Sequence, residues 1–167
     1  IGTILSDWFL IDWLSMFLKC INEFDNKAKF EIITRDNKEI LLSKLNLNKS
    51  IIDKINIISA NPEDMPYLIQ NHSASIMFFK SDISKLGSSP TRVGEILAVG
   101  RPIICNSGVG DLDKIILDNR IGVIVNNLSK SSMMKSVNEL YQILSDDEIS
   151  IRCRNFAESY YSLEKGC

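Results

Sequence analysis

The sequence has little histidine and few cysteines, and these shortages argue against metal-centre chemistry. Its 167 residues include one histidine and four cysteines, with no Cys-x-x-Cys pair. Structural zinc sites need several closely spaced cysteine and histidine ligands, so no metal site is expected. Cys20 and Cys105 lie in apolar segments and are interpreted as reduced core residues, which favours a cytoplasmic location.

Long apolar runs and an excess of positive charge are also absent. The longest apolar stretch, Trp8–Leu14, is interrupted by Asp12 and is too short to span a bilayer. The 19 basic residues are outnumbered by 21 acidic ones, which gives a formal net charge of −2. Nucleic-acid-binding domains usually carry a basic face, so no nucleic-acid partner is expected. The length and the 45% of apolar residues suit one folded domain.

The glycine patterns of dinucleotide and triphosphate sites are missing as well. A Gly-x-Gly-x-x-Gly turn should follow the first strand, where only Gly2 occurs. Gly108-Val109-Gly110 follows a late strand, and Asp113 stands at the position of the third glycine. The chain has no Gly-x-x-x-x-Gly-Lys-[Ser/Thr] sequence. These patterns argue against an NAD site and a P-loop, and no cofactor is predicted.

What the chain does contain is an alternation of short β-rich segments and longer amphipathic ones. Strands are predicted at Ile1–Leu5, Lys29–Thr34, Ile55–Ser59, Ser75–Phe79, Pro102–Cys105 and Gly122–Val125. Helices are predicted at Trp8–Ile21, Lys38–Leu45, Pro62–Ile69, Pro90–Val99, Leu112–Leu117, Ser129–Leu144 and Asp146–Ser162. Several strands are continuous apolar runs, typical of strands covered on both faces. The predicted fold class is α/β, a single Rossmann-like doubly wound parallel sheet of about six strands flanked by helices.

Ligands of such sheets bind at the carboxyl ends of the strands, which directs attention to the helix that follows the fourth strand. Ser89 is a natural N-cap and Pro90 a natural first helical residue. The free N–H groups and partial positive charge of a helix start favour a phosphate. Arg92, in the first turn, adds a candidate charge-assisted contact.

The two sides of this helix have different compositions. The residues expected to face the core are Val93, Ile96, Leu97 and Gly100. Thr91 and Glu95 share the opposite side, where Gly94 and Ala98 leave room for a bulky group. The two oxygens of Glu95 suit the paired hydroxyls of a ribose. The alternative is a solvated helix face with a good cap.

The segment SSPTRVGEILAVGRPIICNSGVGD is similar to the signature region of the group 1 glycosyltransferases, which have the two-Rossmann-domain GT-B architecture. In that family a Pro-[Thr/Ser]-[Lys/Arg]-x-x-Glu-x-[Leu/Met]-Ala-x-Gly-x-Pro-[Val/Ile]-Ile pattern binds the nucleotide-sugar donor. The matching positions are Pro90, Thr91, Arg92, Glu95, Leu97, Ala98, Gly100, Pro102 and Ile104. Weaker similarity covers nearly the whole chain.

The resemblance implies that residues 1–167 are the C-terminal, nucleotide-sugar-binding domain of a glycosyltransferase, a fragment without its N-terminal acceptor domain. The substrate-binding residues it implies are Ser89, Thr91, Arg92, Glu95, Gly108 and Gly110, and no catalytic residue is assigned. Glu95 would hold the donor ribose, and Thr91 and Arg92 would lie near the diphosphate. The implied partners are the nucleotide-sugar donor and the missing domain, through which peripheral membrane association stays open. The isolated fragment is expected to be inactive.

Two departures from the family pattern keep other functions open. Many relatives carry a Glu-x7-Glu pair, but Gly87 stands where the first glutamate would be. Many also have an arginine and a lysine after the first strand, where this chain has neither; Lys80, Lys85 and Arg92 are candidate substitutes. The alternatives are a non-catalytic nucleotide-binding domain of the same fold and a sugar-nucleotide epimerase.

Two further polar residues, His72 and Asp111, are given structural roles in this interpretation. His72 follows a predicted helix and is expected to meet the helix dipole or to lie in a loop, because no catalytic partner is evident. Asp111 and Asp113 are potential metal ligands, but Asp111 is interpreted as the cap of the helix that follows it.

Overall fold

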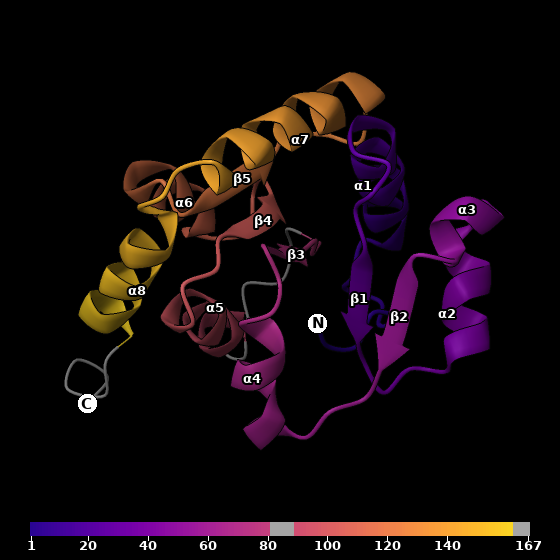
Figure 1. Ribbon diagram of the computed structural model, residues 1–167, viewed down its shortest axis with the longest axis horizontal. Coiled ribbons are helices and arrows are strands. Elements are labelled where there is room, and N and C mark those ends of the chain that lie inside the picture. The colour runs from indigo at the N-terminus through magenta and orange to yellow at the C-terminus, as the bar shows by residue number, and fades with distance from the viewer. Residues whose placement is uncertain (81–88, 162–167) are drawn as a thin grey trace.

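The computed structural model describes residues 1–80 and 89–161, and it consists of short strands connected by helices (Figure 1). The strands are β1 (Phe30–Ile33), β2 (Ile55–Ile58), β3 (Ser75–Met77), β4 (Ile103–Asn106) and β5 (Gly122–Val125). The helices are α1 (Ile11–Phe24), α2 (Lys38–Leu45), α3 (Lys49–Ile52), α4 (Met65–Ile69), α5 (Ser89–Ala98), α6 (Leu112–Asn119), α7 (Lys130–Leu144) and α8 (Ile149–Tyr160). The predicted α/β class is confirmed.

All strand pairs are parallel, as predicted, but the described strands form two sheets. β1 pairs with β2, while β3, β4 and β5 form a second sheet in that order. The expectation of about six strands in one sheet is therefore corrected to five strands in two sheets within the described residues. Figure 1 shows β1 and β2 apart from the three-stranded sheet.

The missing strand is the one predicted at residues 1–5. Gly2 has a φ of +109°, which takes the backbone out of the extended region. The N–H groups of Ile4 and Leu5 donate to Asp36 Oδ2 at 2.6 and 3.0 Å, so they are not available to a neighbouring strand. Only Gly2 N reaches β1, donating to the carbonyl of Ile33 at 2.9 Å. This segment is held as a turn because a side-chain carboxylate satisfies its backbone.

The strands separate two hydrophobic clusters, which is the doubly wound arrangement. One cluster contains Ile32, Ile104, Val123 and Val125 with apolar residues of α1, α2, α3 and α7. The other contains Ile33, Ile103, Cys105 and Ile124 with apolar residues of α4, α5, α6 and α8. Adjacent strand residues fall in different clusters because successive side chains point to opposite faces. All residues of β4 and β5 are buried, as their apolar runs predict.

Several helix boundaries differ from the prediction for local reasons. α1 begins at Ile11 instead of Trp8, because the Trp8 carbonyl accepts from Lys80 N at 2.9 Å and Phe9 bridges Phe79. The helix predicted from Pro62 is a 3-10 turn, Pro62–Asp64, followed by the five-residue α4. The short α3 was not predicted; Asn48 caps it by accepting from the Ile51 N–H.

Cys20, Cys105 and Cys153 are buried free thiols, as interpreted for the first two, whereas Cys167 lies outside the described residues. Burial raises the pKa of Cys105 to about 12, so this thiol stays protonated at neutral pH. Among the described residues, no helix is both long enough and apolar enough to cross a bilayer.

Candidate functional site

The start of α5 and the turn after β4 lie at the same edge of the sheet. β3, β4 and β5 are parallel, so the segments that leave their carboxyl ends gather at that edge. α5 begins after the segment that leaves β3, and residues 107–111 leave β4 directly. The parallel sheet therefore brings the two segments that were predicted to bind a ligand to the same edge.

Asn106 fixes the geometry of this edge, and the sequence interpretation missed it. Asn106 is 3% exposed, and its side chain makes two hydrogen bonds to one residue beyond β3. Phe79 N donates to Asn106 Oδ1 at 2.8 Å, and Asn106 Nδ2 donates to the Phe79 carbonyl at 2.7 Å. The amide thus extends the β3–β4 pairing by one residue through a side chain. A polar residue ending a buried apolar strand, as in IICN, is the signal that points to such a role.

α5 presents the two sides that the sequence predicts. Val93, Ile96 and Leu97 are fully buried. Thr91 is exposed and Glu95 is half-buried on the other side. The helix begins at Ser89 instead of Pro90, so Ser89 is a first-turn residue and not the preceding cap. Proline is accepted at the second position because first-turn N–H groups have no intrahelical partner.

Thr91 and Glu95 line a groove with a volume of about 590 Å³ between α5 and α8. Its lining residues are Thr91, Gly94, Glu95, Ala98, Ala157, Glu158 and Tyr161. Glycine at 94 packs closely against the end of α8, because a Cβ there would lie 3.1 Å from Cγ of Tyr161, which is tighter than an ordinary contact. The small residues beside Glu95 therefore admit the end of α8 as well as leaving open space.

Arg92 and Glu95 form an ion pair on α5. Arg92 Nη1 donates to Glu95 Oε2 at 2.9 Å, across one helical turn. Their side chains are 33% and 41% exposed, so the pair is accessible from solvent. An exposed pair of this kind contributes about 0–1 kcal/mol, and either partner can be drawn to another charged group at small cost.

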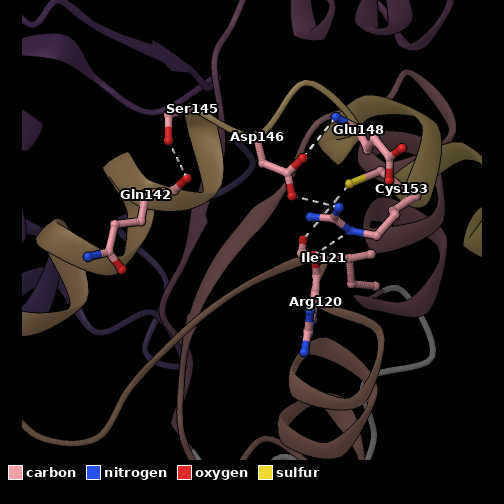
Figure 2. Close-up of polar contacts among 8 residues, drawn as sticks. Arg120, Ile121, Gln142, Ser145, Asp146, Glu148 and Cys153 are labelled. Carbon is pink, nitrogen blue, oxygen red and sulfur yellow. Dashed lines mark hydrogen bonds and ion pairs between the residues drawn. The ribbon is translucent and has the colours of Figure 1, made fainter.

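The far wall of the groove, α8, is anchored by a polar cluster at its first turn (Figure 2). Asp146 accepts from Glu148 N at 3.0 Å and from Arg152 Nη1 at 2.7 Å. Both bonds favour the ionised carboxylate and hold the pKa of Asp146 below its usual value. Arg152 Nε also donates to the Arg120 carbonyl at 3.3 Å, which ties α8 to the end of α6. α8 is thus held by these polar bonds as well as by its packing against α5.

The glycine turn after β4 adopts the backbone that was predicted for it. Gly108 and Gly110 have φ values of +81° and +55°. The Gly108 N–H donates to Asp113 Oδ2 at 2.9 Å, so a side chain already satisfies it. Asp111 precedes α6 but makes no side-chain capping bond, which corrects the assignment of the cap. Asp113 reaches back to the turn instead, because its position in the first turn of α6 faces the Gly108 N–H.

The other predicted residues lie apart from the groove. His72 Nε2 lies 2.8 Å from Glu31 Oε2, a partner the sequence did not reveal. Lys80 is exposed next to the turn of residues 1–10, whereas Lys85 and Gly87 are outside the described residues. The described part of the chain holds no cluster of three or more His, Cys, Asp or Glu residues suited to a metal ion.

Comparison with solved structures identifies the fold. TarM of S. aureus, crystallised as a point mutant with fondaparinux, α-GlcNAc-glycerol and UDP, aligns with a TM-score of 0.73 and 16% identity. A second TarM structure gives a TM-score of 0.74 at 16% identity; each alignment covers 98% of this chain and 32% of TarM. AviGT4, a glycosyltransferase involved in avilamycin A biosynthesis, gives 0.54 at 13% identity, covering 96% of this chain and 48% of AviGT4.

No protein-family model matches the sequence, and the search of curated proteins found no match either. The chain spans about a third of the length of TarM and about half that of AviGT4. The class of protein that these comparisons define is one with a glycosyltransferase-like α/β fold.

Proposed function

We propose that this chain is the donor-binding domain of a two-domain glycosyltransferase and binds a nucleoside diphosphate sugar beside α5. One observation carries the proposal: Glu95 lines a groove beside α5, six residues after the helix begins at Ser89, with Thr91 on the same wall. The fold shared with TarM, which was crystallised with UDP, supports the same reading.

The roles of the individual residues follow from their positions. Glu95 accepts hydrogen bonds from the ribose hydroxyls, and the start of α5, with Ser89 and Thr91, receives the diphosphate. Arg92 turns from Glu95 to the diphosphate, since the exposed ion pair costs little to open. Gly108 and Gly110 allow the ligand to approach the backbone closely at the same edge.

The chemistry is transfer of a glycosyl group. The bond between the anomeric carbon and the diphosphate oxygen breaks, and a bond to an acceptor oxygen forms. Negative charge develops on the departing diphosphate, where the N-terminus of α5 and Arg92 stabilise it. The N-terminal domain, the remainder of a longer chain, supplies the acceptor contacts, so residues 1–167 alone bind donor without turnover.

Calorimetric titration of the full-length protein with UDP, GDP and ADP tests the proposal. Glu95→Gln keeps the shape of the side chain and removes the charge, so the preferred nucleotide should bind on the order of 10- to 100-fold more weakly. Glu139→Gln is the matched control, because Glu139 has nearly the same exposure, 42% against 41%, and pairs with Lys135 on α7. Equal affinity in both variants would remove Glu95 from the site.

A second candidate is a nucleotide-binding domain of the same fold without transfer activity. It is favoured by the turn of residues 2–7, which carries Asp7 and binds Asp36 where many group 1 enzymes place basic residues. Nucleotide binding by the full-length protein without release of sugar from any donor would select this candidate.

A further inference from the structure

The ion pair on α5 occupies part of the carboxylate that the proposed site uses for the ribose. Arg92 Nη1 donates to Glu95 Oε2 at 2.9 Å, so one of the two carboxylate oxygens already has a cationic partner. The other oxygen, Oε1, receives no hydrogen bond from the described part of the chain. Glu95 therefore offers a ligand in the groove one open oxygen and one that Arg92 holds.

A ribose is recognised fully only when both oxygens are open. The 2′- and 3′-hydroxyls each carry one proton, and a carboxylate accepts them side by side, one hydroxyl on each oxygen. While Arg92 is bound to Oε2, its guanidinium and a ribose hydroxyl compete for the same atom. Binding of the complete diol thus requires the ion pair to open.

The position of Arg92 along α5 determines which group can replace its lost partner. Arg92 stands three residues nearer the start of the helix than Glu95, which is about 4.5 Å along the helix axis. In a nucleotide, the phosphates are attached at C5′, away from the diol at C2′ and C3′. A ligand with its diol on Glu95 and its phosphates at the start of α5 therefore passes Arg92.

The ion pair is exposed enough to open in solution. Both side chains are partly exposed, and an ion pair of this kind changes an equilibrium constant by no more than about 5-fold. Among the ion pairs of residues 1–80 and 89–161, Glu95 is the one partner of Arg92. Arg92 is absent from the groove lining, so its guanidinium reaches the carboxylate from outside the groove. The closed pair is a weak and reversible block at the ribose position.

We propose that Arg92 makes recognition of the ribose conditional on a diphosphate, so that the site selects nucleoside diphosphates against free nucleosides. The inference rests on the proposed donor site and deepens it. A nucleoside must open the ion pair and leaves Arg92 without an anion. A nucleoside diphosphate opens the same pair and supplies oxygens to which the guanidinium makes charge-assisted hydrogen bonds. The diol and the diphosphate are therefore positively coupled through one side chain.

A coupling of this kind acts in both directions. Inorganic pyrophosphate bound at the start of α5 holds Arg92 away from Glu95, so it should raise the affinity of the protein for a nucleoside. The nucleoside should raise the affinity for pyrophosphate by the same factor. The stability of the ion pair limits this factor to about 5-fold.

Calorimetric titration of the full-length protein tests the coupling. The probes are inorganic pyrophosphate, whichever of UDP, GDP and ADP binds best, and the corresponding nucleoside. In the parent, saturating pyrophosphate should tighten binding of the nucleoside about 2- to 5-fold. Arg92→Met removes the ion pair, so the free nucleoside should bind about 2- to 5-fold tighter than in the parent, and pyrophosphate should add nothing. The same variant should bind the diphosphate about 10- to 100-fold more weakly.

These opposite changes in one variant separate the coupling from simple damage to the site, which would weaken both ligands. Lys135→Met is the matched control, because Lys135 pairs with Glu139 on α7 and lies outside the groove lining, so all affinities should stay unchanged. Nucleoside binding that is unchanged or weaker in Arg92→Met, or a parent that does not respond to pyrophosphate, overturns the coupling and leaves the donor site standing. Absence of binding by all three nucleoside diphosphates overturns the donor site, and the coupling with it.

Discussion

Replacing Gly100 by alanine should destabilise the fold at the point where α5 ends against α8. Gly100 has a φ of +78°, and the bonds from Gly100 N to Leu97 O and from Arg101 N to Ile96 O close the end of the helix. A Cβ at this position would overlap Ser150 Oγ on α8 and lie 3.1 Å from the Ser150 carbonyl oxygen. The left-handed backbone costs about 1–2 kcal/mol for alanine, and the overlap adds about 1–3 kcal/mol.

The expected loss is therefore about 2–5 kcal/mol in the free energy of unfolding, measured by urea denaturation with an unchanged slope. A double-mutant cycle separates the two causes. Ser150→Ala alone should be nearly neutral, because alanine is a good helix former. In the Gly100→Ala background it should restore about 1–3 kcal/mol by removing the overlapping oxygen. A Gly100→Ala loss below about 1 kcal/mol, or no coupling to Ser150, would refute this account of the α5–α8 contact.

Two further substitutions probe the edge of the sheet and the packing of α1 on α7. Asn106→Leu should lower the free energy of unfolding by about 2–4 kcal/mol, because the N–H and the carbonyl of Phe79 both lose their partner. Asn106→Asp keeps one acceptor and should lower it by less. Equal stability of Asn106→Leu and the parent in urea would contradict the paired bonds. Burial and the bond to Asp25 raise the pKa of Tyr141 to about 12. The folded-state pKa lies above the unfolded value, so this stabilisation is full below about pH 10 and is lost as the pH rises through about 12. Tyr141→Phe should abolish that part of the alkaline pH dependence, and an unchanged difference between parent and variant across this range would refute it.

The strands of the second sheet were predictable from the sequence. A strand that is buried on both faces needs apolar side chains at successive positions, and this gives a continuous apolar run. GVIV and IICN are strands with every residue buried, close to the predicted boundaries. The two sides of α5 also followed from spacing alone, with Val93, Ile96 and Leu97 in the core. In these segments the local pattern and the tertiary environment agree.

The predictions failed where a residue far along the chain, or on another element, determines the local conformation or hydrogen bonding. The apolar letters of residues 1–5 suggested a strand, but Asp36, some thirty residues away, binds the N–H groups of Ile4 and Leu5. Asp111 looked like the cap of α6, whereas Asp113 makes the bond to the Gly108 turn. The partner of His72, Glu31, lies on another element. Periodicity carries no information about such pairs, so a single sequence does not reveal them.

The turn of residues 2–10 lies against the residues that follow β3, at the edge of the sheet where the proposed donor site is. Leu10 N donates to the Phe78 carbonyl at 3.0 Å, and Lys80 N donates to the Trp8 carbonyl at 2.9 Å. Ligands of open α/β sheets bind outside the carboxyl ends of the strands, so this turn borders the expected position of the diphosphate. Residues 2–7 carry no basic side chain, so within the proposed site it is Arg92 of α5 that offers a positive charge to the diphosphate.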